Sequence, residues 1–269
     1  MVHNLSMKIP PSSMQYSWLL LLLLNYVYAR GGNAADVSDA HEPFRYQYRL
    51  HHLNPLVQPF QVVGAASGQA TETYKGRRIA PVMSAAGADW LTREDREQNE
   101  QPEKVLDALN IKEGITVADV GAGVGYFSLR LARRVGNKGR VLAVDVQPEM
   151  LELLKNNMQK EQLSNIDLIL GTSLDPHLPE NSVDLALLVD VYHEFQNPEK
   201  MMGGIRSSLK PEGRLVLVEY RGEDPSVPIK PEHKMTVKQV LFEIEPMGFR
   251  LKETLEFLPW QHIFIFTRN

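Results

Sequence analysis

The stretch ITVADVGAGVGYFSLRLA, from Ile115 to Ala132, decides the fold. An apolar run suited to a buried strand stops at the acidic residue Asp119, three glycines follow at alternate positions, and a helical pattern starts at Tyr126. A strand, a tight turn and a helix N-terminus in this order bring a nucleotide-like ligand against bare backbone. The stretch therefore predicts an α/β domain whose first turn is a ligand site.

Similar apolar runs alternate with helical patterns along the rest of the chain. The runs predict parallel strands covered on both faces, and they are Ile115–Val120, Val141–Val146, Ile166–Leu170, Val183–Val189 and Arg214–Tyr220. The helical patterns are Tyr126–Val135, Pro148–Glu161, Pro198–Leu209 and Val237–Met247. Two last strands, Arg250–Glu256 and Gln261–Thr267, are joined so briefly that they must pair antiparallel. The predicted fold class is α/β, a doubly wound, mostly parallel sheet of seven strands with an antiparallel last strand.

The N-terminal sequence has a pattern typical of a targeting signal. Trp18–Leu24 is an unbroken apolar run with Lys8 upstream and no acidic residue before Asp36. A helix that spans a bilayer needs about 20 apolar residues, and this run is shorter. Residues 1–29 are therefore predicted to be a cleaved signal peptide, which implies a periplasmic or secreted protein with no membrane span after cleavage. An uncleaved anchor and a cytoplasmic protein translated from Met7 are the alternatives.

Residues 30–75 are predicted to be a linker or extended arm. They are rich in Gly, Ala, Ser, Pro and Gln and show no sustained helical or strand period. Three histidines in this segment, His41, His51 and His52, lack further ligands at fixed spacing and are weak evidence for a metal site. We predict no metal ligands from the sequence.

Residues 76–114 predict an N-terminal helical cap on the main domain at 115–269. Thr92 with Asp95 three residues later resembles a capping box, and Pro102 stands at a first-turn position. Three cap side chains are candidates for the mouth of a site, namely Trp90, Arg93 and Arg96. A helix face that only packs and is solvated is the interpretation that the sequence favours for them.

Composition excludes several classes of function. The 269 residues carry a formal net charge of −4, so the chain lacks the broad basic field that nucleic-acid binding favours. No nucleic-acid partner is therefore predicted. The absence of cysteine removes thiolate nucleophiles, disulfides and Cys-ligated zinc or iron–sulfur sites.

The spacing of the glycines discriminates between two cofactor classes. A dinucleotide fingerprint needs its third glycine three residues after the second, which is the position of Tyr126, whereas the third glycine here is Gly125. The acidic residue directly before the turn, Asp119, is also foreign to the dinucleotide pattern. A nicotinamide cofactor is thus disfavoured.

The chain resembles the class I S-adenosylmethionine-dependent methyltransferases over residues 115–267. Their first motif, an acidic residue followed by alternate glycines, corresponds to DVGAGVG, and their second, an acidic residue that ends the second strand, corresponds to Asp145. LKPEGRLVLVEY (Leu209–Tyr220) is similar to their fifth-strand motif, and MGF (Met247–Phe249) precedes a similar antiparallel ending. The resemblance implies a Rossmann-like fold and S-adenosylmethionine as the cofactor.

The resemblance also implies which residues bind the donor. The glycines let backbone approach the donor, Asp119 orients the turn, and the carboxylate of Asp145 accepts hydrogen bonds from the ribose hydroxyls. Met150 packs against adenine, and Thr172 or Ser173 meets its amino group. The predicted cofactor-binding residues are Asp119, Gly121, Gly123, Gly125, Asp145, Val146, Met150, Thr172, Ser173 and Asp190.

The stretch LLVDVYHEF (Leu187–Phe195) is predicted to border the methyl group and the acceptor. It falls at the carboxyl end of a central strand, where open α/β sheets hold their ligands. His193 is the candidate base, with Tyr192 as an alternative orienting group, and a histidine that only caps or packs a turn is an equally open interpretation. The Asn/Asp-Pro-Pro-Tyr/Phe motif of nitrogen methyltransferases is missing here, which disfavours an adenine or glutamine-amide acceptor.

The predicted function is methyl transfer from S-adenosylmethionine to a small-molecule acceptor. Two alternatives stay open at this point, a nicotinamide-dependent oxidoreductase and an S-adenosylmethionine-binding module without turnover. The sequence does not decide the oligomeric state.

Overall fold

The computed structural model describes residues 72–269. The predicted signal peptide at 1–29 and nearly all of the predicted arm at 30–75 lie outside the described residues, so both stay predictions. Within residues 72–269 no helix is long and apolar enough to cross a membrane.

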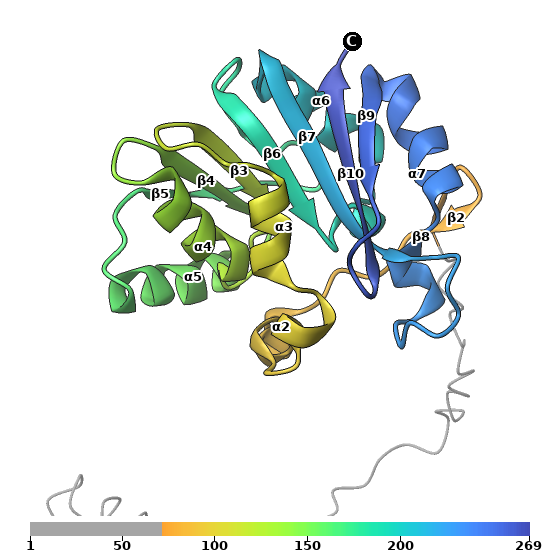
Figure 1. Ribbon diagram of the computed structural model, residues 1–269, viewed down its shortest axis with the longest axis horizontal. Helices are drawn as coiled ribbons and strands as arrows, with labels where there is room; N and C mark the ends of the chain where they lie inside the picture. The colour runs from red at the N-terminus through yellow and green to blue at the C-terminus, as the bar shows by residue number, and fades with distance from the viewer. Residues whose placement is uncertain (1–71) are drawn as a thin grey trace, which may run out of the picture. The chain divides into compact units, whose positions relative to one another are not determined.

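The described chain is built on one mostly parallel sheet (Figure 1). In spatial order its strands are β5 (Ile166–Leu170), β4 (Arg140–Asp145), β3 (Thr116–Val120), β6 (Val183–Val189), β7 (Leu209–Arg221), β10 (Gln261–Arg268) and β9 (Phe249–Leu255). Strands β3 to β7 are parallel, and β10 is antiparallel to both of its neighbours. The predicted fold class and the antiparallel pairing of the last two strands are confirmed.

The number of strands and one strand boundary differ from the prediction. An eighth strand, β8 (Lys234–Met235), pairs parallel with β7, and its two residues are too few to produce a sequence pattern. Strand β7 begins at Leu209 rather than at Arg214, because Leu209 pairs with Val183 before the register shifts. Such an irregularity lets the strand continue through the Pro-Glu-Gly segment that suggested a break.

Side chains that alternate along each strand build two apolar cores, one on each face of the sheet. On one face Leu185 and Leu187 of β6 pack with α3 (Pro102–Ala108), α4 (Tyr126–Val135) and α5 (Pro148–Lys160). On the other face Ala186 and Leu188 pack with α6 (Pro198–Ser208) and α7 (Val237–Ile244). The chain crosses from one face of the sheet to the other after β5. The neighbouring strands β3 and β6 are therefore followed by helices on opposite faces, α4 and α6. This switch point is where a doubly wound sheet opens a ligand crevice.

The N-terminal segment forms the predicted cap, with different internal boundaries. It contains a short hairpin, β1 (Thr73–Tyr74) with β2 (Arg77–Arg78), then a 3-10 helix η1 (Ala85–Thr92), α2 (Arg96–Asn99) and α3. The hairpin starts inside the predicted arm. Pro102 opens α3 as predicted.

The predicted capping box at Thr92 is wrong. Thr92 ends η1 instead of starting a helix, and its hydroxyl donates back to the carbonyl of Asp89. Asp95 is the residue before α2, and its side chain caps nothing. The cap that does form is at Ser84, whose hydroxyl accepts from the amide of Ala86 at 3.3 Å.

Candidate active site

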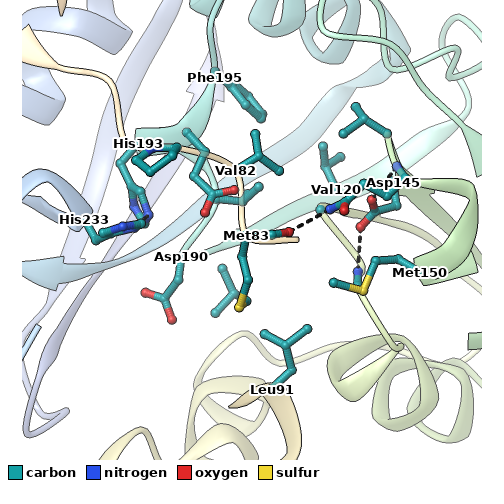
Figure 2. A pocket seen from close by; sticks show the side chains of 18 of the residues that line it. Val82, Met83, Leu91, Val120, Asp145, Met150, Asp190, His193, Phe195 and His233 are labelled. Atoms are coloured by element: carbon teal, nitrogen blue, oxygen red, sulfur yellow. Dashed lines mark hydrogen bonds between the residues drawn. The ribbon is translucent and has the colours of Figure 1, made fainter. Parts of the chain in front are cut away.

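A cavity of about 950 Å³ lies at the carboxyl ends of β3, β4 and β6, beneath the cap. The turn after β3, the end of β4 and the loop after β6 contribute to its wall, and so do η1, α2 and the loop that follows β7. Figure 2 shows Asp145 and Met150 on one side of this cavity and His193 and His233 on the other. Its position matches the switch point, and its size suits a cofactor together with a small second ligand.

The glycine turn forms one wall of the cavity. Gly121 and Gly123 line the cavity and have φ values of +78° and +54°. A Cβ on Gly121 would lie 2.4 Å from a methyl of Val191, and one on Gly123 would lie 2.7 Å from a methyl of Leu91. The glycines are therefore required by the protein's own packing as well as by the backbone conformation. Gly125 lies outside the cavity wall, where a Cβ would meet the side chain of Leu154.

Asp119 supports the turn from below and is not part of the cavity wall. Its carboxylate accepts a hydrogen bond of 2.5 Å from the hydroxyl of Ser128, which lies in the first turn of α4. The side chain is buried. Burial raises the pKa of the Asp119 carboxyl to about 6, although the bond from Ser128 opposes the shift. Asp119 thus joins the end of β3 to the start of α4.

Asp119→Asn is expected to flatten the dependence of stability on pH. The unfolded carboxyl loses its proton near pH 4, and the folded one keeps it to about pH 6, so stability falls as the pH rises through this window. A shift of roughly two units corresponds to about 3 kcal/mol in the free energy of unfolding. Urea titrations between pH 4 and pH 7 check this, with Asp89→Asn, a change at an exposed aspartate, as the control. If the free energy of unfolding changes with pH equally in Asp119→Asn and in the natural protein, the raised pKa of Asp119 is refuted.

Asp145 connects the end of β4 to the glycine turn. Its Oδ2 accepts from the amide of Gly123 at 2.8 Å, and its Oδ1 accepts from the amide of Gln147 at 2.9 Å. Burial raises the pKa of this carboxyl, and the two backbone donors counteract the shift. Each oxygen retains a lone pair for a further donor. The carboxylate is therefore fixed and able to accept two hydroxyl groups of a ligand.

The residues after β4 and β5 continue this side of the cavity. Val146, Met150, Thr172 and Ser173 all line it, with Met150 nearly fully buried. The hydroxyl of Thr172 accepts from the amides of Leu174 and Asp175, so it holds its own loop. Ser173 keeps its hydroxyl free of such bonds within the described residues.

Asp190 directly follows β6 and lines the cavity. It has φ of +52°, an unusual conformation for a residue other than glycine. Its carboxylate accepts from Nε2 of Gln261 at 2.8 and 3.0 Å. Burial, together with the charges of Glu100 and Glu219, raises the pKa of Asp190 well above its usual range.

A buried ionic cluster fixes the cap over the cavity. Glu100 has no exposed surface and accepts from Arg93, from Nε of Arg96 at 2.6 Å and from the hydroxyl of Tyr220 at 2.8 Å. Arg96 also donates to the carbonyl of Leu91 at 2.6 Å. Arg93, Arg96 and Tyr220 line the cavity. The cap side chains therefore reach the site, contrary to the favoured interpretation of the sequence.

His193 lies at the opposite side of the cavity and is almost fully buried. Its Nδ1 is 2.5 Å from Oε2 of Glu219 on β7, and its Nε2 is 3.1 Å from Nδ1 of His233. Burial lowers the pKa of His193, but the charge of Glu219 and the bond to it outweigh burial and raise the pKa overall. Glu194 also lines the cavity, and burial raises its pKa to about 7.

Tyr192 is not brought to the cavity. Its ring is fully buried in the core that contains α6 and α7, and its hydroxyl donates to Glu243 at 2.8 Å. Arg77 pairs with the same carboxylate at 2.9 Å and donates to the backbone carbonyl of His193 at 2.8 Å. Tyr192 and Arg77 thus hold the loop from behind.

Residues 111–257 match the protein family described as "Methyltransferase domain". This chain belongs to that family. The match covers more than half of the chain and includes the glycine turn, Asp145 and the loop with His193. The methyltransferase resemblance predicted from the sequence is confirmed.

The methyltransferase domain is similar to proteins of several organisms. It is 35% identical over 124 residues to an uncharacterised methyltransferase-like protein of Schizosaccharomyces pombe, covering 46% of this chain and 45% of that protein. It is 28% identical over 114 residues to a demethylmenaquinone methyltransferase of Oceanobacillus iheyensis, covering 42% and 48%. The chain thus spans about half the length of the curated relatives it matches.

One solved structure covers more of the methyltransferase domain. A SAM-dependent methyltransferase from Aquifex aeolicus has a TM-score of 0.66 and 28% sequence identity, covering 70% of this chain and all of that one. This similarity agrees with the fold.

The structure brings most predicted donor residues of the methyltransferase domain to one cavity. Those that line the cavity are Gly121, Gly123, Asp145, Val146, Met150, Thr172, Ser173 and Asp190. The sequence interpretation did not single out Glu100 or Glu219, and it gave Glu194 no role of its own. The spacing of Arg96 and Glu100, four residues apart on a helical segment, is the signal that could have indicated the first of these.

Proposed function

We propose that this protein transfers a methyl group from S-adenosylmethionine to a small-molecule acceptor. The observation that carries the proposal is one cavity with two different sides. One side holds Gly121, Gly123 and Asp145, and the other holds His193 and His233. A donor bound along the first side leaves room for a second ligand at the other.

The cofactor prediction agrees with the family. The matched region includes the glycine turn and Asp145, and the Aquifex aeolicus protein is described as SAM dependent. Family membership also counts against the nicotinamide alternative, which Tyr126 already disfavoured. S-adenosylmethionine is therefore the cofactor.

The lining of the second side supports a small acceptor with apolar character. Phe195, Met201, Pro228 and Ile229 contribute apolar surface beside His193. The Oceanobacillus iheyensis relative is described as a demethylmenaquinone methyltransferase. A lipophilic or phenolic ring is consistent with both observations.

Methyl transfer is an in-line displacement, so the residues of this site act mainly by positioning. The donor wall fixes the methyl group, and the loop after β6 fixes the acceptor. His193 is the residue that we propose for contact with the acceptor, because Glu219 holds its ring at the cavity wall. Arg77 and the amide of Ala80 both bind its carbonyl, which keeps the loop in place.

The proposal is tested by donor binding and by transfer together. The purified full chain should show a thermal shift with S-adenosylmethionine or S-adenosylhomocysteine and none with NAD, and it should label small molecules of a cell extract from a methyl-labelled donor. His193→Ala should keep the thermal shift and lower transfer by about a hundredfold, since misplacement of a reactant costs that much. His177→Ala, which changes an exposed histidine outside the cavity, should alter neither.

Each outcome separates the alternatives. A shift with NAD alone would contradict the assignment of the donor. Donor binding without labelling of any small molecule would favour a binding module without turnover. Labelling that is confined to protein would contradict the small-molecule acceptor.

A further inference from the structure

We propose that His193, Glu194 and His233 bind one divalent transition-metal ion at the acceptor side of the cavity. Their ligand atoms, a ring nitrogen of each histidine and a carboxylate oxygen, all lie within 4.8 Å of one another. All three residues line the cavity, and Figure 2 shows the rings of His193 and His233 side by side. His193 and His233 are 40 residues apart in the sequence, so no local motif indicates the site.

The spacing of the two rings suits a shared ion. A metal bonded to two imidazole nitrogens at about 2.0–2.1 Å holds those nitrogens roughly 3 to 3.5 Å apart. Nε2 of His193 and Nδ1 of His233 are 3.1 Å apart, and the two rings are close to perpendicular at 83°. A shared proton would give a similar distance, but a metal ion also uses the carboxylate oxygen of Glu194, which lies within 4.8 Å of both nitrogens.

The surroundings of His193 are those of a metal-binding histidine. Such histidines usually donate their second ring nitrogen to a carboxylate, which fixes the tautomer and orients the ring. Here Nδ1 of His193 lies 2.5 Å from Oε2 of Glu219. If Nδ1 carries the ring proton, the lone pair of Nε2 faces the site. Oε1 of Glu219 accepts from the amide of Tyr192 at 3.0 Å, so the supporting carboxylate is itself held.

His233 is also held in place. It ends the 3-10 helix η3 (Pro231–His233) and directly precedes β8, which pairs with β7 beside Glu219. The ammonium of Lys234 donates to the carbonyls of Asp224 and Val227 at 3.0 and 2.6 Å, which ties down the loop before η3. Both histidines are thus positioned by the same strand, and little movement is needed to bind an ion.

The ligand set indicates the class of ion. Two imidazoles and one carboxylate suit zinc and other first-row transition ions, whereas magnesium and calcium prefer oxygen ligands. The carboxylates of Glu219 and Asp190 add negative charge around His193. Three protein ligands leave at least one coordination position open for an oxygen of the acceptor.

The role of the ion rests on the proposed function. A hydroxyl group of the acceptor bound to the ion would lose its proton to solvent, and the resulting oxyanion would attack the methyl carbon of the donor. The C–O bond forms as the S–C bond of the sulfonium breaks, so the products are a neutral ether and a neutral thioether. His193 is then a ligand, in place of the base expected from the sequence.

The test is a zinc titration of the metal-free full chain by calorimetry. The natural protein should bind one equivalent more than His233→Ala or Glu194→Gln. Glu219→Gln, which removes only the supporting carboxylate, should weaken that equivalent about tenfold to a hundredfold. His177→Ala is the matched control and should bind zinc as the natural protein does. Any zinc bound by the N-terminal histidines is common to every variant and cancels in the comparison.

Equal zinc binding by the natural protein, His233→Ala and Glu194→Gln would overturn the metal site. Displacement of the zinc by millimolar magnesium would overturn the assignment to a transition ion. The thermal shift with S-adenosylhomocysteine, measured on each variant and on His233→Asn, shows that the fold is intact. If S-adenosylhomocysteine shifts the melting temperature but all variants bind equal zinc, the metal site is wrong and the proposed function is retained. If the variants bind less zinc but S-adenosylhomocysteine gives no shift, the metal site is retained and the proposed function is wrong.

Discussion

Asp145→Ala is expected to weaken the binding of S-adenosylhomocysteine at least a hundredfold. The carboxylate already accepts the amides of Gly123 and Gln147, and it presents its remaining lone pairs to the cavity. Each hydrogen bond from a ribose hydroxyl to a charged group contributes about 1.5–3 kcal/mol, so two of them correspond to about two to four powers of ten in Kd. Calorimetry on the full chain measures the effect.

Two further variants separate contact from charge. Asp145→Asn keeps an acceptor oxygen and the shape of the side chain, so its loss of affinity should be intermediate. Glu149→Ala removes an exposed negative charge four residues away, outside this cavity, and should change Kd little. Unaltered binding by Asp145→Ala would remove this residue from the donor site.

Glu100→Ala is expected to lower the free energy of unfolding by about 3–5 kcal/mol. The substitution leaves Arg93 and Arg96 without their buried partner and deprives the hydroxyl of Tyr220 of its acceptor. Unpaired charges that stay buried are far more costly than an exposed ion pair that is lost. Urea unfolding followed by circular dichroism measures the change.

The pair of Glu97 and Arg130 provides the control, in which Glu97 is exposed and Arg130 is half-buried. These side chains are 2.6 Å apart at the surface, so Glu97→Ala should cost less than about 1 kcal/mol. Glu100→Gln, which retains the shape and loses the charge, should lie between the two. A cost for Glu100→Ala no larger than that for Glu97→Ala would show that the cluster does not hold the cap.

The donor side of the site was predictable because its signals are local. The glycines follow a buried strand directly, Asp145 ends the next strand, and Met150 lies in the helix after it. Parallel strands bring such ends to one edge of a sheet, so spacing along the chain translates into proximity. The same reasoning predicted the mostly parallel sheet, whereas the spatial order of its strands came only from the structure.

The rest of the site depends on contacts between distant segments. Glu100 meets Tyr220, Asp190 meets Gln261, and His193 meets His233, and none of these pairs leaves a periodic signal in the sequence. Neighbours in a single turn are equally ambiguous. Tyr192 and His193 are adjacent, yet one side chain enters the core and the other enters the cavity, because the 3-10 turn η2 (Tyr192–Glu194) turns them to different sides.

The two sides of the cavity also differ in how they can be rebuilt by protein engineering. Residues 121–150 supply most of the donor side from one continuous turn–helix–strand–helix unit, whereas the opposite side comes from separate loops at 81–84, 191–196 and 228–233. Those loops are fixed at their ends by the sheet and the hairpin. They can therefore be grafted or diversified one at a time to change the accepted molecule, with the donor unit kept as a constant module.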